Sequence, residues 1–374
     1  MGFEFLNGAE AICRAAVYAG CDFFAGYPIT PATPILIRMM KEMPKRGRFA
    51  IQGEDEIASI GMCIAASMAG KKPMTATSGP GISLYSENIG LGIMGEVPLV
   101  IVNVQRLGPA TGGATTGAQG DVQFLRWVTS GGLPMVVFVP SDIESMFVLT
   151  IHAFNIAEML RTPVFLLTSK DMVLSTHTVE VDKLAFPEVV NRTRYDGKGP
   201  FVPYRFDQAS DVPEFLPIGA DRPVRFTTSM HDEYAYLTKS PECVERKLVH
   251  LQEKITKHAD AIMSVKEDFE AGAESLLIAY GINAGLCREV VEKVRGKGKK
   301  CSLLVVESIF PVPVSSITRA LNGVRRVILP EMNFSLYAHA VEHLIPPDVD
   351  LISIPKVDGE LLTVEDVVTK GDLM

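Results

Sequence analysis

Features that mark several common protein classes are absent from this sequence of 374 residues. Its six cysteines are scattered, with no Cys-x-x-Cys pair, so we expect neither a disulfide framework nor an iron–sulfur cluster on this chain. No run reaches the ~18 consecutive apolar residues that a membrane helix requires. The N-terminus also lacks the continuous apolar segment of a secretory signal. Together these absences predict a reduced, cytoplasmic setting with no membrane partner.

Positive charge is also scarce. Lys and Arg number 36 against 44 Asp and Glu, which gives a formal net charge of −8. The one dense basic run, RGKGKK at 295–300, lies between a helical pattern and a strand, so it predicts a solvated turn. This balance argues against a nucleic-acid partner. A hydrophobic content of 47% over this length instead allows two or three domains with large cores.

Apolar strands alternate with helical patterns along the first half of the chain. The expected strands are 21–25, 73–77, 98–104, 135–139 and 163–168. This alternation predicts a mostly parallel sheet with helices on both faces, an α/β fold. Two helix starts are marked by polar caps: Asn7, and the acidic run 54–56, which opens a helix of small residues that ends at Gly70.

The second half of the chain changes character near residue 174. The stretch to about 236 is rich in proline and irregular. A long amphipathic helix, at the surface or at an interface, is expected from Ser240 to about Phe269. Strands and helices alternate again over 273–374, which predicts a smaller doubly wound domain. We therefore expect three parts: residues 1–190, 191–272 and 273–374.

Two motifs stand close together in the first part. Residues 27–34 read YPITPATP, and their prolines fix the backbone around Thr30, which suits a hydroxyl that must be held still. About twenty residues later the acidic run opens the small-residue helix, and TSGPG at 77–81 follows a strand as an expected tight loop.

This order of motifs resembles the α subunit of 2-oxoacid:ferredoxin oxidoreductases, thiamine-diphosphate enzymes that decarboxylate a 2-oxoacid and pass two electrons to ferredoxin. The resemblance is most specific over 26–34 and 52–124. It implies a pyrimidine-binding-type doubly wound domain for thiamine diphosphate, followed by a smaller transketolase-C-terminal-like α/β domain. It also implies a coenzyme-A-dependent oxidation of 2-oxoglutarate to succinyl-CoA and CO₂.

The same resemblance implies a catalytic acid. Counting back from Gly61 and Ala69-Gly70 favours Glu56 as the carboxylate that hydrogen-bonds N1′ of the coenzyme's aminopyrimidine and activates it. Glu54 and Asp55 are expected to cap the helix. The alternative is that all three acids only cap the helix. The residues implied in coenzyme binding are Pro28, Ile29, Thr30, Glu56 and Gly79.

Substrate binding is implied for Thr30 and Arg106. Arg106 follows the strand at 98–104, where α/β sites lie, and a guanidinium can bind a carboxylate through two hydrogen bonds. In the resembling family these positions bind the α-carboxylate and oxo group of the 2-oxoacid. The alternatives are a turn-stabilising hydroxyl for Thr30 and an ordinary ion pair for Arg106.

Other features imply partner chains. The sequence has no Gly-Asp-Gly motif of the kind that commonly binds Mg²⁺ with the diphosphate, so no metal is expected on this chain. A β subunit would bring the diphosphate site, Mg²⁺ and a [4Fe–4S] cluster, with ferredoxin as acceptor and γ or δ chains as further separate subunits. The Gly-rich segment 108–123 is expected to be a flexible loop ordered by a partner chain.

Several alternatives stay open from the sequence alone. The same chemistry could act on pyruvate or on branched-chain 2-oxoacids. The chain could also be half of a non-redox split thiamine enzyme, or a non-catalytic interaction subunit. The run His231-Asp232-Glu233 resembles a motif of the 2-oxoglutarate branch, although a surface turn explains it more simply.

Overall fold

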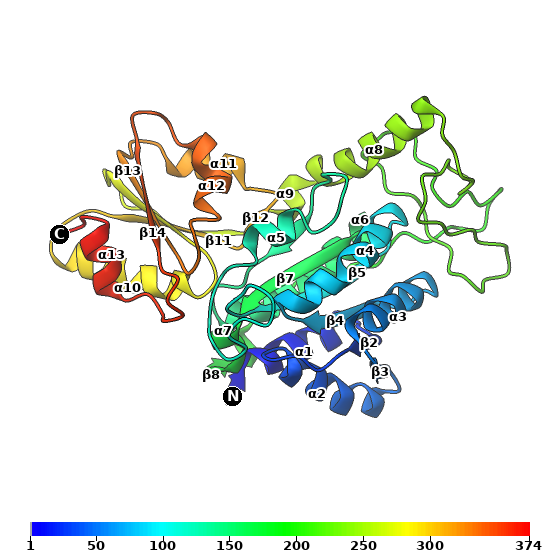
Figure 1. Ribbon diagram of the computed structural model, residues 1–374, viewed down its shortest axis with the longest axis horizontal. Coiled ribbons are helices and arrows are strands. Elements are labelled where there is room, and N and C mark those ends of the chain that lie inside the picture. The colour runs from blue at the N-terminus through cyan, green and yellow to red at the C-terminus, as the bar shows by residue number, and fades with distance from the viewer. Residues whose placement is uncertain (1) are drawn as a thin grey trace.

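Seven strands form the larger sheet of the computed structural model, which describes residues 2–374 (Figure 1). All neighbours run parallel except β12, which is antiparallel to β6. In spatial order the strands are β12 (Ser308–Phe310), β6 (Val136–Phe138), β7 (Pro163–Ser169), β5 (Leu99–Gln105), β4 (Pro73–Thr77), β2 (Phe23–Gly26) and β3 (Phe49–Gln52). The expected doubly wound parallel sheet is confirmed.

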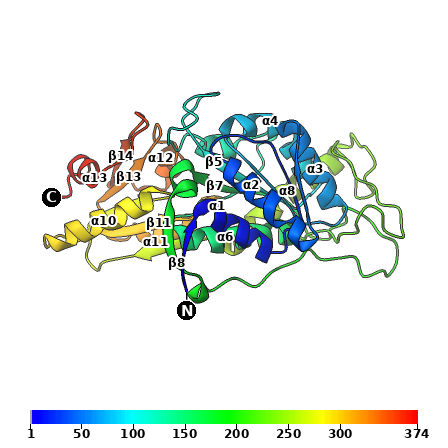
Figure 2. The ribbon, with the colours of Figure 1, turned by 90° about the horizontal axis from the view of Figure 1, so that it is seen from below.

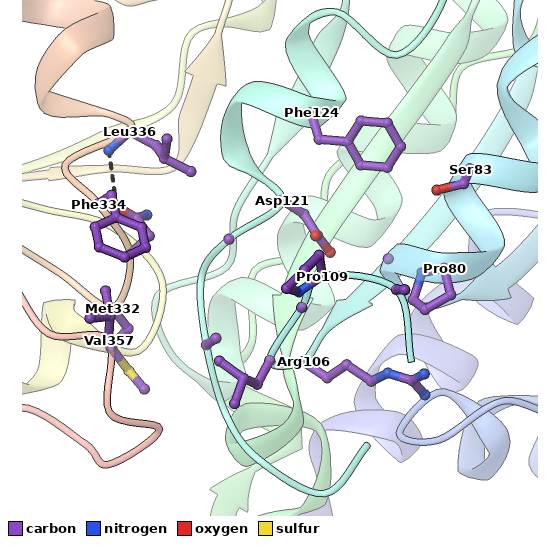
Figure 3. A pocket seen from close by; sticks show the side chains of 17 residues that line it. Pro80, Ser83, Arg106, Pro109, Asp121, Phe124, Met332, Phe334, Leu336 and Val357 are labelled. Carbon is purple, nitrogen blue, oxygen red and sulfur yellow. Dashed lines mark hydrogen bonds between the residues drawn. The ribbon is translucent and has the colours of Figure 1, made fainter. Parts of the chain in front are cut away.

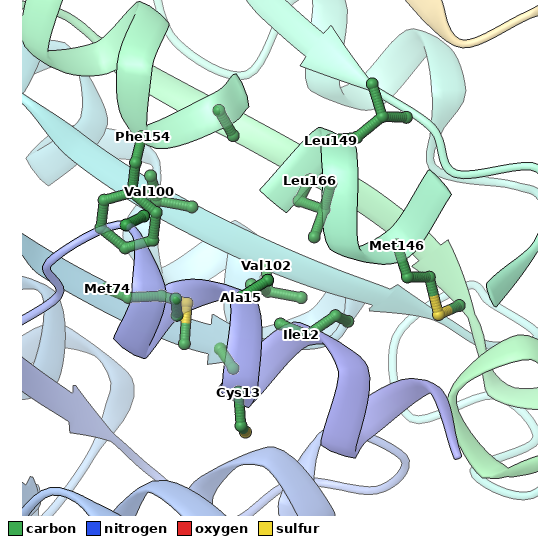
Figure 4. Packing of buried hydrophobic residues seen from close by; sticks show 14 of the residues in the cluster. Ile12, Cys13, Ala15, Met74, Val100, Val102, Met146, Leu149, Phe154 and Leu166 are labelled. Carbon is green, nitrogen blue, oxygen red and sulfur yellow. The ribbon is translucent and has the colours of Figure 1, made fainter. Parts of the chain in front are cut away.

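Helices cover both faces of this sheet. One face carries α1 (Gly8–Tyr18), α2 (Thr33–Glu42) and α6 (Ile143–Leu160), and the other carries α3 (Glu56–Met68), α4 (Gly79–Met94) and α5 (Val122–Arg126). Successive side chains of a strand point to opposite faces. Val100 and Val102 of β5 therefore enter the core beneath α1 and α6, as Figure 4 shows, whereas Leu99 and Ile101 enter the other core.

The helix α6 is long and apolar enough to cross a membrane by length and composition. However, 72% of it is buried inside the protein, where it packs against α1 and β7. It therefore serves here as a central core helix of the first sheet.

Polar caps begin the helices α1 and α3 where the sequence predicts them. Asn7 Oδ1 accepts a hydrogen bond from the Glu10 N–H at 2.9 Å, and Asp55 Oδ1 accepts one from the Ala58 N–H at 2.7 Å. Such caps satisfy backbone donors that have no partner within the helix. Because Asp55 is the cap, Glu56 becomes the first residue of α3, and its side chain is buried.

The expected tight loop at residues 77–81 is wrong. Only Thr77 and Ser78 precede a helix, and α4 begins at Gly79 with Pro80 in its first turn. Proline fits this position because its missing N–H has no intrahelical acceptor there and its fixed φ suits the helix. A glycine–proline–glycine run that reads as a turn therefore starts a helix of 16 residues.

The long helix expected from Ser240 to about Phe269 is also wrong in its second half. The helix α8 (Pro241–Thr256) is followed by the short α9 (Ala259–Ile262) and the strand β9 (Val265–Asp268). β9 pairs antiparallel with β11 (Ser302–Val306). Pairing with a strand almost forty residues away overrides the local helical pattern.

A second sheet lies beside the first and has five strands within the described residues. In spatial order these are β14 (Asp350–Pro355), β13 (Arg326–Glu331), β10 (Ser275–Ala279), β11 and the antiparallel β9. Its helices are α10 (Asn283–Gly296), α11 (Val314–Ala320), α12 (Ala338–Val341) and α13 (Val364–Lys370). β12 follows β11 but joins the first sheet, so the two sheets are tied together.

The remaining elements are short. β1 (Phe3–Asn7) and β8 (Thr176–Glu180) form an antiparallel pair that the sequence analysis did not predict. Other short helices are η1 (Pro44–Arg46), α7 (Lys170–Leu174), η2 (Val181–Lys183) and η3 (Glu342–Leu344). The irregular segment between η2 and α8 starts near the N-terminus, runs along the first sheet and loops out at the end farthest from the second sheet (Figures 1 and 2).

Three polar residues of α8 are buried, so this part of the expected surface or interface helix lies at an interface within the chain. Lys247, His250 and Lys254 converge on the fully buried carboxylate of Glu96 at 2.6, 3.1 and 2.7 Å. Burial alone would raise the pKa of Glu96, but Lys247, Lys254 and His250 together hold it well below its ordinary value. This cluster attaches α8 to the segment that follows α4.

We predict that Glu96→Gln destabilises the fold by about 3–5 kcal/mol, because two lysines stay buried without a counter-charge. The free energy of unfolding in urea measures this, with Glu87→Gln on the exposed side of α4 as the control. Because the pKa of Glu96 is depressed in the folded state, its contribution is fully present above pH 4.5, its ordinary pKa. It is lost progressively as the pH falls from there through the lower pKa of the folded state. Equal stability of the two variants at pH 7 would contradict the prediction.

Candidate functional site

The carboxyl ends of β4, β5 and β7 form the edge of the first sheet where α/β proteins place their sites. Thr77 ends β4, and Gln105 and Ser169 end β5 and β7. Thr77 lies opposite Asn103 in the sheet register. Arg106 follows β5 directly, as the sequence predicts, and reaches this edge.

Buried polar atoms without partners gather at this edge. Among the described residues, eight buried side-chain polar atoms have no hydrogen-bond partner. Five of them lie here: Thr77 Oγ1, Ser78 Oγ, Asn103 Oδ1, Arg106 Nε and Thr168 Oγ1. Buried polar groups are nearly always hydrogen-bonded in folded proteins. Such a concentration of exceptions indicates a place where a polar ligand binds.

Glu56 lies against the first turn of α4. Its side chain is 7% exposed and forms no hydrogen bond or ion pair with any residue in the described range 2–374. A Cβ atom on Gly81 would lie 3.1 Å from Glu56 Oε1 and 1.9 Å from Thr77 Oγ1. Only glycine therefore fits at position 81. The structure thus places Glu56 beside Gly81, whereas Gly79, the glycine implied in coenzyme binding, lies against Asp121.

Arg106 and the proline-framed turn also meet. Arg106 is 7% exposed, and its Nη1 donates a hydrogen bond to the Thr30 carbonyl oxygen at 2.6 Å. In the described structure this leaves Nε and Nη2, one edge of the guanidinium, free to bind a ligand. Thr30 and Pro28 are exposed and Ile29 is half-buried. The turn therefore presents its outer side to solvent at this edge.

A cavity of about 500 Å³ opens between this edge and the second sheet (Figure 3). From the first sheet it is lined by Gly79, Arg106 and Asp121, and from the second by Met332 and the exposed Phe334. Glu56 and Thr30 do not line it. Arg106 is thus shared between the cavity and the turn, while Glu56 lies on the other side of the first turn of α4.

Three site residues were missed by the sequence analysis: Asn103, Gln105 and Asp121. Asn103 Nδ2 donates to Asp121 Oδ2 at 2.9 Å, and the Asp121 N–H donates to Gln105 Oε1 at 3.1 Å. Burial raises the pKa of Asp121, although Asn103 and Arg106 oppose the rise. The available signal was two polar residues at the end of an otherwise apolar strand.

The motif His231-Asp232-Glu233 does not reach this edge. Asp232 Oδ1 accepts hydrogen bonds from the Tyr234 and Tyr236 N–H groups, as in a turn. His231 itself is buried and its ring lies 4.2 Å from that of Tyr204. No group of three or more His, Cys, Asp or Glu residues that could hold a metal ion occurs among residues 2–374.

Comparison with known proteins defines the class. Residues 14–247 match the family described as pyruvate flavodoxin/ferredoxin oxidoreductase, thiamine diphosphate-binding, and residues 273–367 match the pyruvate:ferredoxin oxidoreductase core domain II. The chain therefore belongs to the pyruvate flavodoxin/ferredoxin oxidoreductase family, as its motifs predict.

Particular relatives are similar along nearly the whole chain. The 2-oxoglutarate synthase subunit KorA of Methanocaldococcus jannaschii is 37% identical over 96% of this chain and 97% of its own length. The ketoisovalerate oxidoreductase subunit VorB of Methanothermobacter thermautotrophicus is 32% identical over 99% of this chain and 97% of its own. Both names describe subunits.

A solved enzyme has the same fold. It is the 2-oxoglutarate:ferredoxin oxidoreductase from Magnetococcus marinus, with 2-oxoglutarate, coenzyme A and succinyl-CoA bound. The superposition has a TM-score of 0.91 at 29% identity and covers all of this chain. This chain spans 65% of the length of that solved chain.

We predict that Gly81→Ala lowers the free energy of unfolding, because the new methyl group would overlap Thr77 Oγ1 and press on Glu56. The matched control is Gly61→Ala in α3, where a Cβ meets no atom within 4 Å. That change should stabilise the helix by about 0.5–1 kcal/mol. Urea unfolding of both variants measures the difference. Equal effects of the two substitutions would show that the first turn of α4 is not tightly packed.

Proposed function

We propose that this chain is the α subunit of a thiamine-diphosphate-dependent 2-oxoacid:ferredoxin oxidoreductase that converts 2-oxoglutarate and coenzyme A to succinyl-CoA and CO₂. The observation that carries the proposal is the buried, unpaired carboxylate of Glu56 beside the glycine-bounded turn of α4. The family match and the full-length similarity to 2-oxoglutarate synthase subunits support it.

The residues at the sheet edge fit the pyrimidine half of the coenzyme. An aminopyrimidine offers ring nitrogens and an amino group, and the largely buried Glu56 together with the unpartnered atoms of Thr77 and Ser78 offers complementary polar groups. When bound, thiamine diphosphate supplies a nucleophilic carbon and takes up electron density during decarboxylation. Glu56 would exchange a proton with the ring nitrogen of the coenzyme.

The setting of Glu56 favours that role. Asp55 holds the start of α3 through its cap, so the position of the Glu56 backbone is fixed. The Glu56 side chain packs against the backbone at Gly81, next to Thr77. This packing excludes water from one side of the carboxylate. A hydrogen bond to a charged group is stronger in such a low-dielectric environment than in water.

Arg106 would bind the carboxylate of the 2-oxoacid. Its Nη1 is held by the Thr30 carbonyl, and its free Nε and Nη2 edge matches the two oxygens of a carboxylate. The hydroxyl of Thr30, on an exposed turn, would add a further hydrogen bond to the substrate. This arrangement orients the oxo group before bond cleavage.

The partners complete the site. A β subunit would supply the diphosphate site, Mg²⁺ and a [4Fe–4S] cluster, with γ and δ chains as additional subunits and ferredoxin as the electron acceptor. We place the assembly in the cytoplasm, and we assign residues 1–190 to the coenzyme-binding domain.

The choice of 2-oxoglutarate over a branched 2-oxoacid follows the higher identity to the 2-oxoglutarate synthase subunit, 37% against 32% for the ketoisovalerate enzyme.

We predict that Glu56→Gln lowers turnover of the reconstituted complex by about 10²–10⁴-fold, the usual range for loss of a general acid or base. The assay is reduction of a low-potential electron acceptor that depends on 2-oxoglutarate and coenzyme A. Glu54→Gln, on an exposed residue of the same acidic run, is the control. Full activity of Glu56→Gln would show that the chain is a non-catalytic subunit.

We predict that Arg106→Ala raises the KM for 2-oxoglutarate by more than tenfold, because a charge-assisted pair to the substrate carboxylate is lost. The same acceptor assay at varied substrate concentration measures it. Arg325→Ala removes a guanidinium that is mostly solvent-exposed and should leave the KM unchanged. An unaltered KM for Arg106→Ala would exclude Arg106 from carboxylate binding.

A further inference from the structure

Residues 119–121 connect the two sheets at the edge of the cavity, and we call this segment the clasp. From the sequence, the whole stretch 108–123 is expected to be a flexible loop ordered by a partner chain. The structure shows instead that its last part is fixed within this chain. Gln119 is 1% exposed, and Gly120 separates it from Asp121, so the two side chains hold opposite ends of a very short connection.

Gln119 is bound by the second sheet and its neighbours. Its Oε1 accepts hydrogen bonds from Asn283 Nδ2 at 2.9 Å and from the Met332 N–H at 3.1 Å. Its backbone N–H donates to the Met332 carbonyl at 3.0 Å, and its carbonyl accepts from Asn333 Nδ2 at 2.8 Å. With four such bonds, this end of the clasp follows the second sheet.

Asp121 holds the first sheet. Its carboxylate accepts from Asn103 and its N–H donates to Gln105, both on β5. A Cβ atom on Gly79 would lie 2.9 Å from Asp121 Oδ1 and 3.0 Å from Oδ2. The carboxylate therefore lies directly against the first residue of α4, where the positive end of the helix dipole favours it.

The first turn of α4 is thus enclosed by two carboxylates. Asp121 lies against Gly79, and Glu56 lies against Gly81. If the first turn of α4 moved toward Asp121, space would open beside Glu56, and the reverse movement would open space beside Asp121. The bond from Asn103 to Asp121 also fixes the side-chain amide of Asn103, whose Oδ1 is buried and without a partner in the described residues. Asp121 therefore controls the positions of several groups that the proposed coenzyme would contact.

We infer that the clasp transmits the position of the second sheet to the first turn of α4, and that Asp121 is a positioning residue for the pyrimidine half of the coenzyme. This inference rests on the proposed function. It gives the second sheet a role in coenzyme binding, although Asn283 does not line the cavity. The role is separate from that of Glu56, because Asp121 acts through Asn103 and α4.

The test is the affinity of the reconstituted complex, freed of coenzyme, for thiamine diphosphate with Mg²⁺, measured by titration calorimetry. Asp121→Ala should weaken binding by about tenfold or more, which corresponds to the loss of one or two hydrogen bonds to a charged group. Asp121→Asn keeps an oxygen that can accept from Asn103, so it should restore much of the affinity. Asp260→Ala, on an exposed residue, is the control.

The second sheet is tested by Asn283→Ala, which removes one of the bonds that hold Gln119. It should also weaken coenzyme binding several-fold. When it is combined with Asp121→Ala, the two effects should be less than additive, because both changes loosen the same connection. At saturating coenzyme, Asp121→Ala should retain a larger share of wild-type kcat than Glu56→Gln, since Glu56 is still present. If Asp121→Ala does not fold, Asp121→Ser replaces it in each measurement.

Wild-type affinity in Asp121→Ala, or in Asn283→Ala, would overturn the inference while leaving the proposed function intact. Full additivity of the two substitutions would also overturn it. A wild-type complex that binds no thiamine diphosphate would instead overturn the proposed function, and the inference with it.

Discussion

The burial of one carboxylate, that of Glu56, constrains the rest of the site. Glu56 is only 7% exposed and has no hydrogen-bond or ion-pair partner among the described residues, so the fold must hold it there by other means. The Asp55 cap fixes the start of α3, and Gly81 leaves room for the side chain beside Thr77. Buried polar groups are nearly always paired within the fold, so a largely buried carboxylate that is rigidly supported and left without a partner is a candidate for binding a polar ligand.

The architecture explains why the site is at an edge of the first sheet and why it is open on one side. Parallel strands carry their carboxyl ends to one side, so β4 and β5 bring Thr77, Asn103 and Arg106 together although they are distant in sequence. The exposed turn at Thr30 and the open cavity leave this side uncovered. In the proposed assembly a β subunit covers it and would supply the site for the diphosphate and Mg²⁺.

Much of this could be predicted from the sequence, and the failures have physical reasons. Short-range sequence patterns correctly predicted the helix caps at Asn7 and Asp55 and both ends of the strand β4. They failed where distant partners decide the structure: β9 pairs with a strand far along the chain, and the lysines of α8 are buried because Glu96 neutralises them. The roles of Gln119 and Asp121 were missed for the same reason, since their partners lie in other elements.

The most direct test of the central claim is a structure of the complex of this chain with its β partner and thiamine diphosphate. The account predicts that a Glu56 carboxylate oxygen lies within hydrogen-bond distance, about 2.6–3.2 Å, of a ring nitrogen of the aminopyrimidine, beside the first turn of α4. A coenzyme bound elsewhere, or a Glu56 side chain paired with a protein group and turned away from the ring, would contradict it.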